Sequence, residues 1–192
     1  GTLDVLTSAD LTVQELEISE SGLAAATGIV TVDGSGSTIT QTAGSALTLG
    51  SASGSTGTLN VQNSGVFTAS HTGTLNVNAT GNLNVDSGGF FNVIPPNAGN
   101  NQNGTNGGTL TSGGTVDVAS GSLRILGGRG GNSAIPGPPG LPGGIGGSFL
   151  ATGGSVTASG TAEITVLGGR GGNGATLGQG GSGGMGGAIT IG

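Results

Sequence analysis

The sequence contains no cysteine, lysine, tyrosine or tryptophan. Without cysteine, neither disulfide bonds nor thiolate metal sites can hold the chain together. The only cationic side chains are Arg124, Arg129 and Arg170, against nine Asp and Glu residues, and the formal net charge is −6. This composition provides no basic patch of the kind that binds nucleic acid. No apolar run approaches the ~20 residues of a membrane-spanning helix, so we do not expect membrane insertion.

Charge is scarce and glycine is abundant. Charged residues make up 6% of the chain, and 47 of its 192 residues are glycine. Disordered segments can share a Gly and Ser bias, but they usually combine low hydrophobicity with high charge. Here Val, Leu and Ile recur at strand spacing instead. A lysine-free chain rich in Thr, Ser, Asn and Gly is typical of secreted material, and we expect an extracellular or cell-surface location.

A glycine recurs every eight residues, at Gly57, Gly65, Gly73, Gly81 and Gly89. In each octad, positions three and five are apolar and position four is Asn or Thr, as in GTLNVQNS. Such alternation predicts a half-buried strand of about five residues followed by a tight polar turn. One such unit cannot bury its apolar face alone, whereas stacked copies bury a continuous core. The sequence therefore predicts an all-β fold, a parallel β-helix or β-solenoid.

Position four of the octads forms a polar row of Asn60, Thr68, Asn76, Asn84 and Asn92. If the octads stack in one column, these side chains form a hydrogen-bonded ladder with a spacing of about 4.8 Å. If the octads alternate between faces, the same side chains face solvent and serve solubility.

The rhythm changes along the chain. Residues 1–94 have octad-type strand spacing, and residues 95–108, which begin with two prolines and continue with Asn and Gly, predict a surface loop. Residues 109–192 contain two Gly-rich repeats, in which LRILGGRGGN at 123–132 and ITVLGGRGGN at 164–173 are 41 residues apart. We expect one elongated array.

Each repeat contains a Gly-rich excursion of about twenty residues between two strands. Glycine recurs there every third residue, and the first excursion also holds Pro136, Pro138, Pro139 and Pro142. A three-residue period with proline in the gaps predicts polyproline II-like flaps. Because this conformation has no internal hydrogen bonds, a flap must pair with other flaps, with the solenoid wall or with a neighbouring subunit.

The stretch GSGSTITQTAGSALTLGSASGSTGTLNVQNSGVFT at 34–68 resembles the repeats of bacterial autotransporter passengers and filamentous-haemagglutinin-like secreted β-solenoids. The resemblance extends over about half of the chain. It implies a right-handed parallel β-helix, secretion and a role in adhesion, surface coats or fibres. The Gly-rich excursions are similar to the polyglycine II bundles of glycine-rich antifreeze proteins and some phage adhesin tips.

The sequence offers no catalytic, cofactor-binding or metal site. The carboxylates Asp33, Asp86, Asp117 and Glu163 are isolated, whereas polysaccharide-cleaving β-helices need clustered carboxylates beside a basic residue. His71, the one histidine, has no second ligand at metal-binding spacing. The GGRGGN segments lack the GK[ST] ending of a phosphate-binding loop. We therefore expect a protein that is not an enzyme.

The two terminal strands are the candidate assembly interface. They contain Thr2, Leu3, Asp4 and Val5 at one end and Ala188, Ile189, Thr190 and Ile191 at the other. Open sheet edges are normally blunted in monomers, so bare edges favour head-to-tail stacking of identical copies into a filament or surface layer. If the chain is instead an excised piece of a longer passenger, the bare ends result from the cut.

Further residues are candidates for contacts outside the subunit. Arg129 and Arg170 are expected to contact C-terminal carbonyls or to form inter-subunit salt bridges with an acidic surface, for which the acidic N-terminal third is one candidate. Asn78 and Asn103 lie in Asn-x-Thr sequons that a suitable host can glycosylate.

A surface-binding solenoid is the alternative hypothesis. A flat face rich in Thr and Asn could bind ice, a polysaccharide or a cell surface, and its signature would be a regular outward Thr-x-Thr column. Thr38-Ile39-Thr40 has that pattern, and Thr31 extends it.

Overall fold

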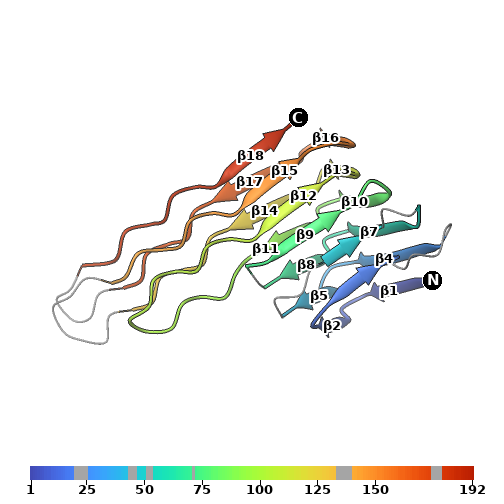
Figure 1. The fold of residues 1–192 in the computed structure, drawn as a ribbon. Coiled ribbons are helices and arrows are strands. Elements are labelled where there is room, and N and C mark those ends of the chain that lie inside the picture. Colours follow the sequence, from blue (N-terminus) through green and yellow to red (C-terminus); the bar gives the residue numbers. More distant parts are fainter. Residues whose placement is uncertain (20–25, 43–46, 51–53, 71, 133–139, 174–178) are drawn as a thin grey trace.

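The computed structural model describes residues 1–19, 26–42, 47–50, 54–70, 72–132, 140–173 and 179–192. Glu20, His71 and three of the four prolines of the first Gly-rich excursion lie outside these residues. The described part contains strands and no helix, and its strands form three parallel six-stranded sheets (Figure 1). The prediction of an all-β parallel solenoid is confirmed.

Each sheet takes every third strand of the chain. Sheet A consists of β1 (Thr2–Leu6), β4 (Thr27–Asp33), β7 (Thr56–Gln62), β10 (Gly81–Asp86), β13 (Thr115–Ala119) and β16 (Ser155–Ser159). Sheet B consists of β2 (Asp10–Val13), β5 (Thr38–Gln41), β8 (Val66–Ala69), β11 (Phe90–Val93), β14 (Ser122–Leu126) and β17 (Glu163–Leu167). Sheet C consists of β3 (Leu16–Ile18), β6 (Leu47–Leu49), β9 (Thr74–Val77), β12 (Thr109–Ser112), β15 (Ser148–Ala151) and β18 (Ala188–Ile191).

Three consecutive strands, one from each sheet, form one rung, and the rungs stack in register. The regular octads show this directly, because Gly81 pairs with Gly57 and Leu83 pairs with Leu59 across β10 and β7. Three octads therefore complete one rung. The apolar residues at positions three and five of each octad, which are Leu, Val, Phe or Ala, project inward, where they form a single core shared by all three sheets.

Two aromatic rings lie at the centre of this core. Phe67 of β8 and Phe91 of β11 occupy paired positions in sheet B, and both are fully buried. Their rings stack with centroids 5.1 Å apart and an interplanar angle of 4°. Stacked rungs thus bring identical side chains together, which adds ring contact to the apolar burial.

The octad glycines are required by close approach at the corners of the rungs. A Cβ atom on Gly57 would lie 2.1 Å from the Ile18 carbonyl oxygen, and one on Gly89 would lie 2.1 Å from the Val61 oxygen. The left-handed turn positions are instead taken partly by Asn63 and Ser64, at φ 52° and 67°. The eight-residue glycine period therefore corresponds to the number of residues between successive corners of the coil.

The polar row of the octads is divided among the three sheets. Only every third octad stacks in one column, and there Asn84 Nδ2 donates to Asn60 Oδ1 at 2.8 Å. Asn92 pairs with Thr68 in sheet B, and Asn76 pairs with Thr111 in sheet C. Both interpretations hold in part, because an amide ladder forms between two rungs while the whole row stays outside the core.

Three excursions leave the solenoid at the corner between sheets B and C, and they run side by side in Figure 1. They comprise residues 94–108 after β11, 127–147 after β14 and 168–187 after β17. The first includes the expected surface loop, which contains no strand. All three project from the last three rungs, so the N-terminal half of the solenoid lacks them.

The excursions hydrogen-bond to one another with a three-residue period. Gly127 donates to the carbonyl of Leu167, at the end of β17, and Gly130 donates to that of Arg170 in the third excursion. Gly128 and Gly131 donate to the first excursion at the carbonyls of Thr105 and Gln102. Donors three residues apart thus serve the same neighbour, as in a bundle of polyproline II-like strands. The sequence left three possible hydrogen-bonding partners for each flap: another flap, the solenoid wall or a neighbouring subunit. In the structure, the flaps pair with one another.

This bundle has room for glycine alone at its contact positions. In the third excursion, a Cβ on Gly184 would lie 1.9 Å from the Gly144 carbonyl oxygen, whereas one on the preceding Gly183 would lie 3.6 Å from its nearest neighbour. Neither glycine has a left-handed φ, so the difference is one of space.

We expect Gly184→Ala to loosen the excursion bundle and Gly183→Ala to leave it intact. Overpacking of this kind typically costs about 1–3 kcal/mol. Hydrogen exchange measures the effect: the amides of Gly143 and Gly146, which donate to Ser182 and Met185, should exchange faster in the first variant only. Equal protection in both variants would contradict the packed bundle.

Adjacent phenylalanines give a second matched pair. Phe91 is fully buried, and its neighbour Phe90 points outward with 38% of its surface exposed. We expect Phe91→Ala to lower the free energy of unfolding by about 3–5 kcal/mol, because it leaves a cavity beside Phe67. Phe90→Ala should cost about 1 kcal/mol or less. Denaturant titration measures the free energy of unfolding of both variants. A larger loss for Phe90→Ala than for Phe91→Ala would contradict our assignment of Phe91 to the inward face.

Candidate functional site: the two ends of the solenoid

Among the described residues, the first rung, β1 to β3, and the last, β16 to β18, are each paired on one side only. The termini lie at opposite ends of the stack (Figure 1). Each end therefore presents three open strand edges around a cross-section of the core.

Six inward columns run from one end to the other, and all are apolar at both ends. The N-terminal positions are Leu3, Val5, Leu11, Val13, Leu16 and Ile18. The C-terminal positions are Val156, Ala158, Ile164, Val166, Ile189 and Ile191. Leu3 is 42% exposed, Ile189 46% and Ile191 61%, although equivalent residues of the inner rungs are buried. The C-terminal end is therefore an exposed section through the core, whereas at the N-terminal end Leu3 is exposed while Val5, Leu16 and Ile18 remain buried.

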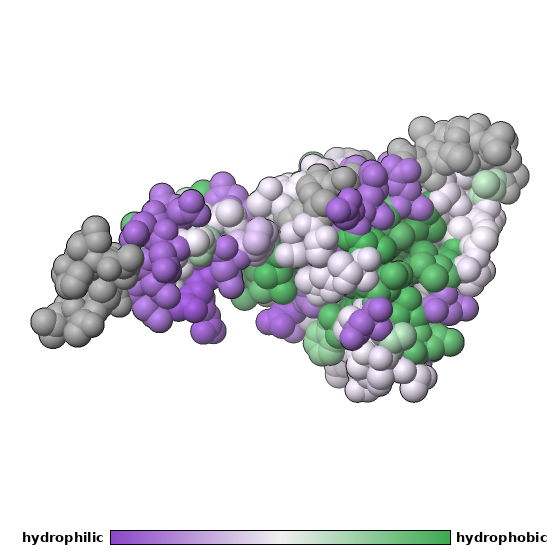
Figure 2. Space-filling model, turned by 90° about the horizontal axis from the view of Figure 1, so that it is seen from below, coloured by the Kyte–Doolittle hydropathy of each residue, from purple (hydrophilic) through white to green (hydrophobic). Residues whose placement is uncertain are grey.

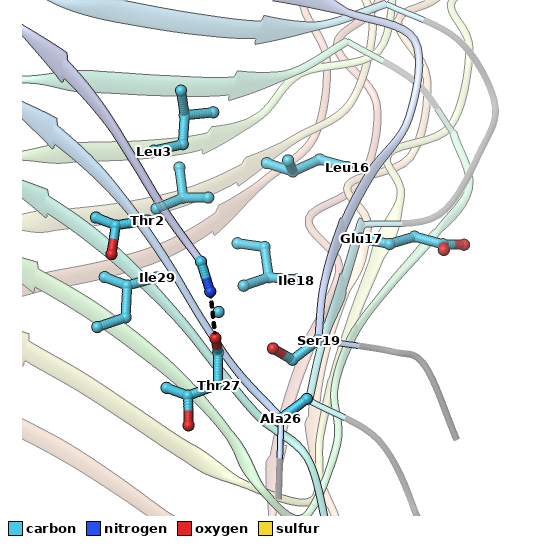
Figure 3. Close-up of a pocket in the computed structure, with 12 residues that line it drawn as sticks. Thr2, Leu3, Leu16, Glu17, Ile18, Ser19, Ala26, Thr27 and Ile29 are labelled. Atoms are coloured by element: carbon cyan, nitrogen blue, oxygen red, sulfur yellow. Dashed lines mark hydrogen bonds between the residues drawn. The ribbon is translucent and has the colours of Figure 1, made fainter. Parts of the chain in front are cut away.

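The N-terminal face is hollowed. A cavity of about 440 Å³ lies there, with Leu3, Leu16 and Ile18 in its lining (Figure 3). At its edge the N-terminal ammonium of Gly1 donates to the carbonyl oxygen of Thr27 at 2.6 Å. Figure 2, seen from the side of β1 and β2, shows apolar side chains gathered on the solenoid and hydrophilic ones along the excursions.

The backbone edges of the two ends are complementary in phase. In parallel sheets the N–H and C=O of one residue point to the same side, and they alternate along the strand. Ile29 N–H donates to Gly1 and Thr7 N–H donates to Asp33, so the backbone groups of Thr2 and Asp4 face the open side of β1. These are outward-facing residues.

The opposite phase holds at the C-terminal face. Gly192 N–H donates to the Ala151 carbonyl, so the backbone groups of Ile189 and Ile191 face the open side of β18. These are inward-facing residues. An in-register contact between the two faces would therefore match donors with acceptors as every internal pair of rungs does.

The predicted interface strands lie in different sheets. β1, with Thr2–Val5, is at the edge of sheet A, and β18 is at the edge of sheet C. Continuation of the stack would place β16 against β1, β17 against β2, and β18 against β3. The sequence prediction thus missed four further edge strands. The octad period could have indicated them if the number of octads per rung had been known.

Charges lie around the apolar faces. In sheet B one outward column begins with Asp10 at the N-terminal end and finishes with Glu163 at the C-terminal end. Thr165 donates to Glu163 Oε1 at 2.7 Å and Ser122 to Oε2 at 3.3 Å. These hydrogen bonds lower the pKa of Glu163 below its ordinary value of 4.5.

Arg129 and Arg170 lie side by side near the base of the excursions. The carbonyl of Arg170 accepts the N–H of Gly130 at 2.8 Å, and both side chains are exposed. Neither guanidinium forms an ion pair with a carboxylate of the described residues, which include the acidic side chains of the N-terminal third other than Glu20. Salt bridges between subunits stay a prediction.

The two sequons differ in access. Asn78 is half-buried, and its Nδ2, the atom that carries an N-linked glycan, donates to the Gly50 carbonyl at 2.9 Å. Asn103 lies exposed in the first excursion. Glycosylation at Asn78 would have to displace that hydrogen bond.

The described residues hold no cluster of three or more His, Cys, Asp or Glu side chains that could bind a metal ion. Among the same residues, no helix is long and apolar enough to cross a membrane.

The Thr-x-Thr pattern does not extend along sheet B. Thr38 and Thr40 stand side by side on β5, but Thr38 is flanked by Asp10 and Val66 in the neighbouring rungs. The paired threonines are therefore confined to one rung of this sheet.

No protein-family model matches the chain, and comparisons with curated proteins and with solved structures give no significant match. A functional assignment must therefore come from the geometry of the molecule itself.

Proposed function

We propose that this protein is a secreted, non-enzymatic structural protein whose copies associate head to tail through their open rungs into an extracellular filament or surface layer. The observation that supports the proposal is the complementarity of the two end faces. All six inward columns are apolar at both ends, although Gln41 and Ser112 interrupt two of them inside the stack, and the open backbone edges are complementary in phase.

The driving force is the same as that between rungs inside the chain. The contact would bury end residues such as Leu3 and Ile191, which are largely exposed in the single copy. It would also pair three strands of each copy. Because the two faces differ, the contact is heterologous and does not close, so association continues into a linear polymer.

One pair of charges opposes this contact. In-register stacking would place Glu163 of one copy directly beside Asp10 of the next, about 4.8 Å away along the column. Two like charges at this distance repel by about 1 kcal/mol in a solvent-like dielectric. The proposed polymer is therefore sensitive to pH and ionic strength.

Electron microscopy of the purified chain tests the proposal. We expect long uniform fibres at neutral pH, with an axial repeat equal to the length of one copy. Discrete short rods at all concentrations would overturn self-assembly and would favour a segment of a larger adhesin.

A proline at the open edge provides a specific block. The N–H of Ile191 faces the open side of β18, so Ile191→Pro should remove one intermolecular donor while every internal hydrogen bond remains. We expect short rods instead of fibres, with an unchanged thermal unfolding transition at low protein concentration. Ile191→Val, which keeps the donor, is the matched control and should polymerise. Fibres from the proline variant would contradict the edge-pairing contact.

The charge pair predicts the pH dependence. Glu163 is ionised at neutral pH because its hydrogen bonds hold its pKa below the ordinary value, so its repulsion of Asp10 weakens only in acid. We expect Glu163→Gln to lower the critical concentration at neutral pH several-fold and to flatten its pH dependence. Added salt should strengthen assembly of the unmodified chain. Sedimentation of polymer across pH measures both effects, and weaker assembly of the variant would refute the assigned register.

A further inference from the structure

A groove lies on the outer face of sheet B, where the strands pass into the excursions. Its cavity of about 330 Å³ includes Ile94, Leu126 and Leu167 in its lining. Leu126 and Leu167 are paired across β14 and β17, and Ile94 directly follows Val93, the partner of Ile125. The floor is therefore an apolar column across the last three rungs.

All three cationic side chains of the protein line this one cavity. Arg124 precedes Leu126 by two residues and lies on the sheet side. Arg129 and Arg170 follow the leucines by three residues and lie on the excursion side. We call this cavity, with its apolar floor and arginines on both walls, the arginine groove.

No guanidinium forms an ion pair within the described part of the chain, although the charge of Arg124 acts on the Glu163 carboxylate and helps to lower its pKa. The Arg124 Nε atom is buried there without a hydrogen-bond partner. Three like charges around one small cavity repel one another, and a buried N–H without an acceptor costs free energy. An oxyanion in the groove would relieve both costs, because guanidinium groups bind carboxylate and sulfate through paired hydrogen bonds.

A second hollow continues the groove outward along the excursions. It has a volume of about 200 Å³ and shares Asn97 and Arg129 with the first. Asn100 and Asn132 belong to its lining. Its polar lining of amides suits hydroxyl groups, so the two hollows together match a ligand with acidic groups at one end and hydroxyls along its length.

We propose that the arginine groove binds an acidic oligosaccharide. Its carboxylate or sulfate groups lie among Arg124, Arg129 and Arg170, and its sugar hydroxyls contact the asparagine side chains of the outer hollow. The groove opens on the flank of the solenoid, and its Leu167 and Arg170 belong to the last rung, beside the C-terminal face. Ligand binding in the groove is a separate proposal from head-to-tail assembly.

Isothermal titration calorimetry at low ionic strength tests the proposal. The probes are an oligogalacturonate, a sulfated dextran oligosaccharide and a neutral dextran oligosaccharide of the same length. We expect binding of at least one acidic probe, weakened by added salt, and none of the neutral one. The stronger acidic probe identifies the acidic group. Binding of neither acidic probe, or equal binding of all three, would overturn the proposal.

A free anion is the competing occupant. If inorganic sulfate displaces the bound oligosaccharide at equal molar concentration, the site recognises the anion alone and the oligosaccharide assignment is wrong. If displacement needs a large excess of sulfate, the outer hollow contributes to affinity as proposed.

Variants locate the binding. The double variant Arg129→Gln/Arg170→Gln should weaken binding of the acidic probe about tenfold or more. Ser155→Asp, on the exposed outer face of sheet A, also makes the net charge more negative and is the control for long-range repulsion. It should bind within about twofold of the unmodified chain. Both sites are exposed, so circular dichroism should be unchanged; equal affinity of the double variant and the control would overturn the assignment of the groove.

Discussion

Backbone hydrogen bonding between successive passes of the chain is the interaction on which the whole structure depends. In the solenoid it joins parallel strands of neighbouring rungs, and in the excursions it joins extended segments that lack internal hydrogen bonds. Both arrangements require backbones to approach closely. This requirement explains glycine at the rung corners, as at Gly57, and at the contact positions of the bundle, as at Gly184. The chain has no disulfide and few charged residues, so hydrogen bonds between closely packed backbone segments take on the stabilising role.

The sequence predicted the local elements well because each depends on neighbouring residues. The apolar positions of each octad, such as Leu59 and Val61, face inward, and the strands follow their alternation. Eight-residue spacing does not state how many strands complete a rung, because the closure depends on the corner geometry. The stacking of Asn60 with Asn84, and the membership of β1 and β18 in different sheets, therefore required the structure.

The same limit applies to the excursions and to the arginine groove. The three-residue glycine period predicts extended flaps, and nothing in it states that the flaps of three rungs leave at one corner. That corner brings Arg124, Arg129 and Arg170 to a single cavity, although they belong to two different rungs. A cue was present in the repeated segments LRILGGRGGN and ITVLGGRGGN, which place Arg129 and Arg170 at equivalent positions. Only stacking of the repeats shows that these positions are adjacent.

Among the described residues, the three excursions leave from one corner of the last three rungs and run side by side, so they form a rib on the C-terminal half of the solenoid (Figure 1). Six rungs at about 4.8 Å give a length of about 29 Å per copy. A head-to-tail polymer would thus carry one such rib per repeat. Such a polymer has a direction that is visible from its side. A partner that binds to the ribs would therefore bind in one orientation and at intervals of one copy along the polymer, at sites away from its two ends.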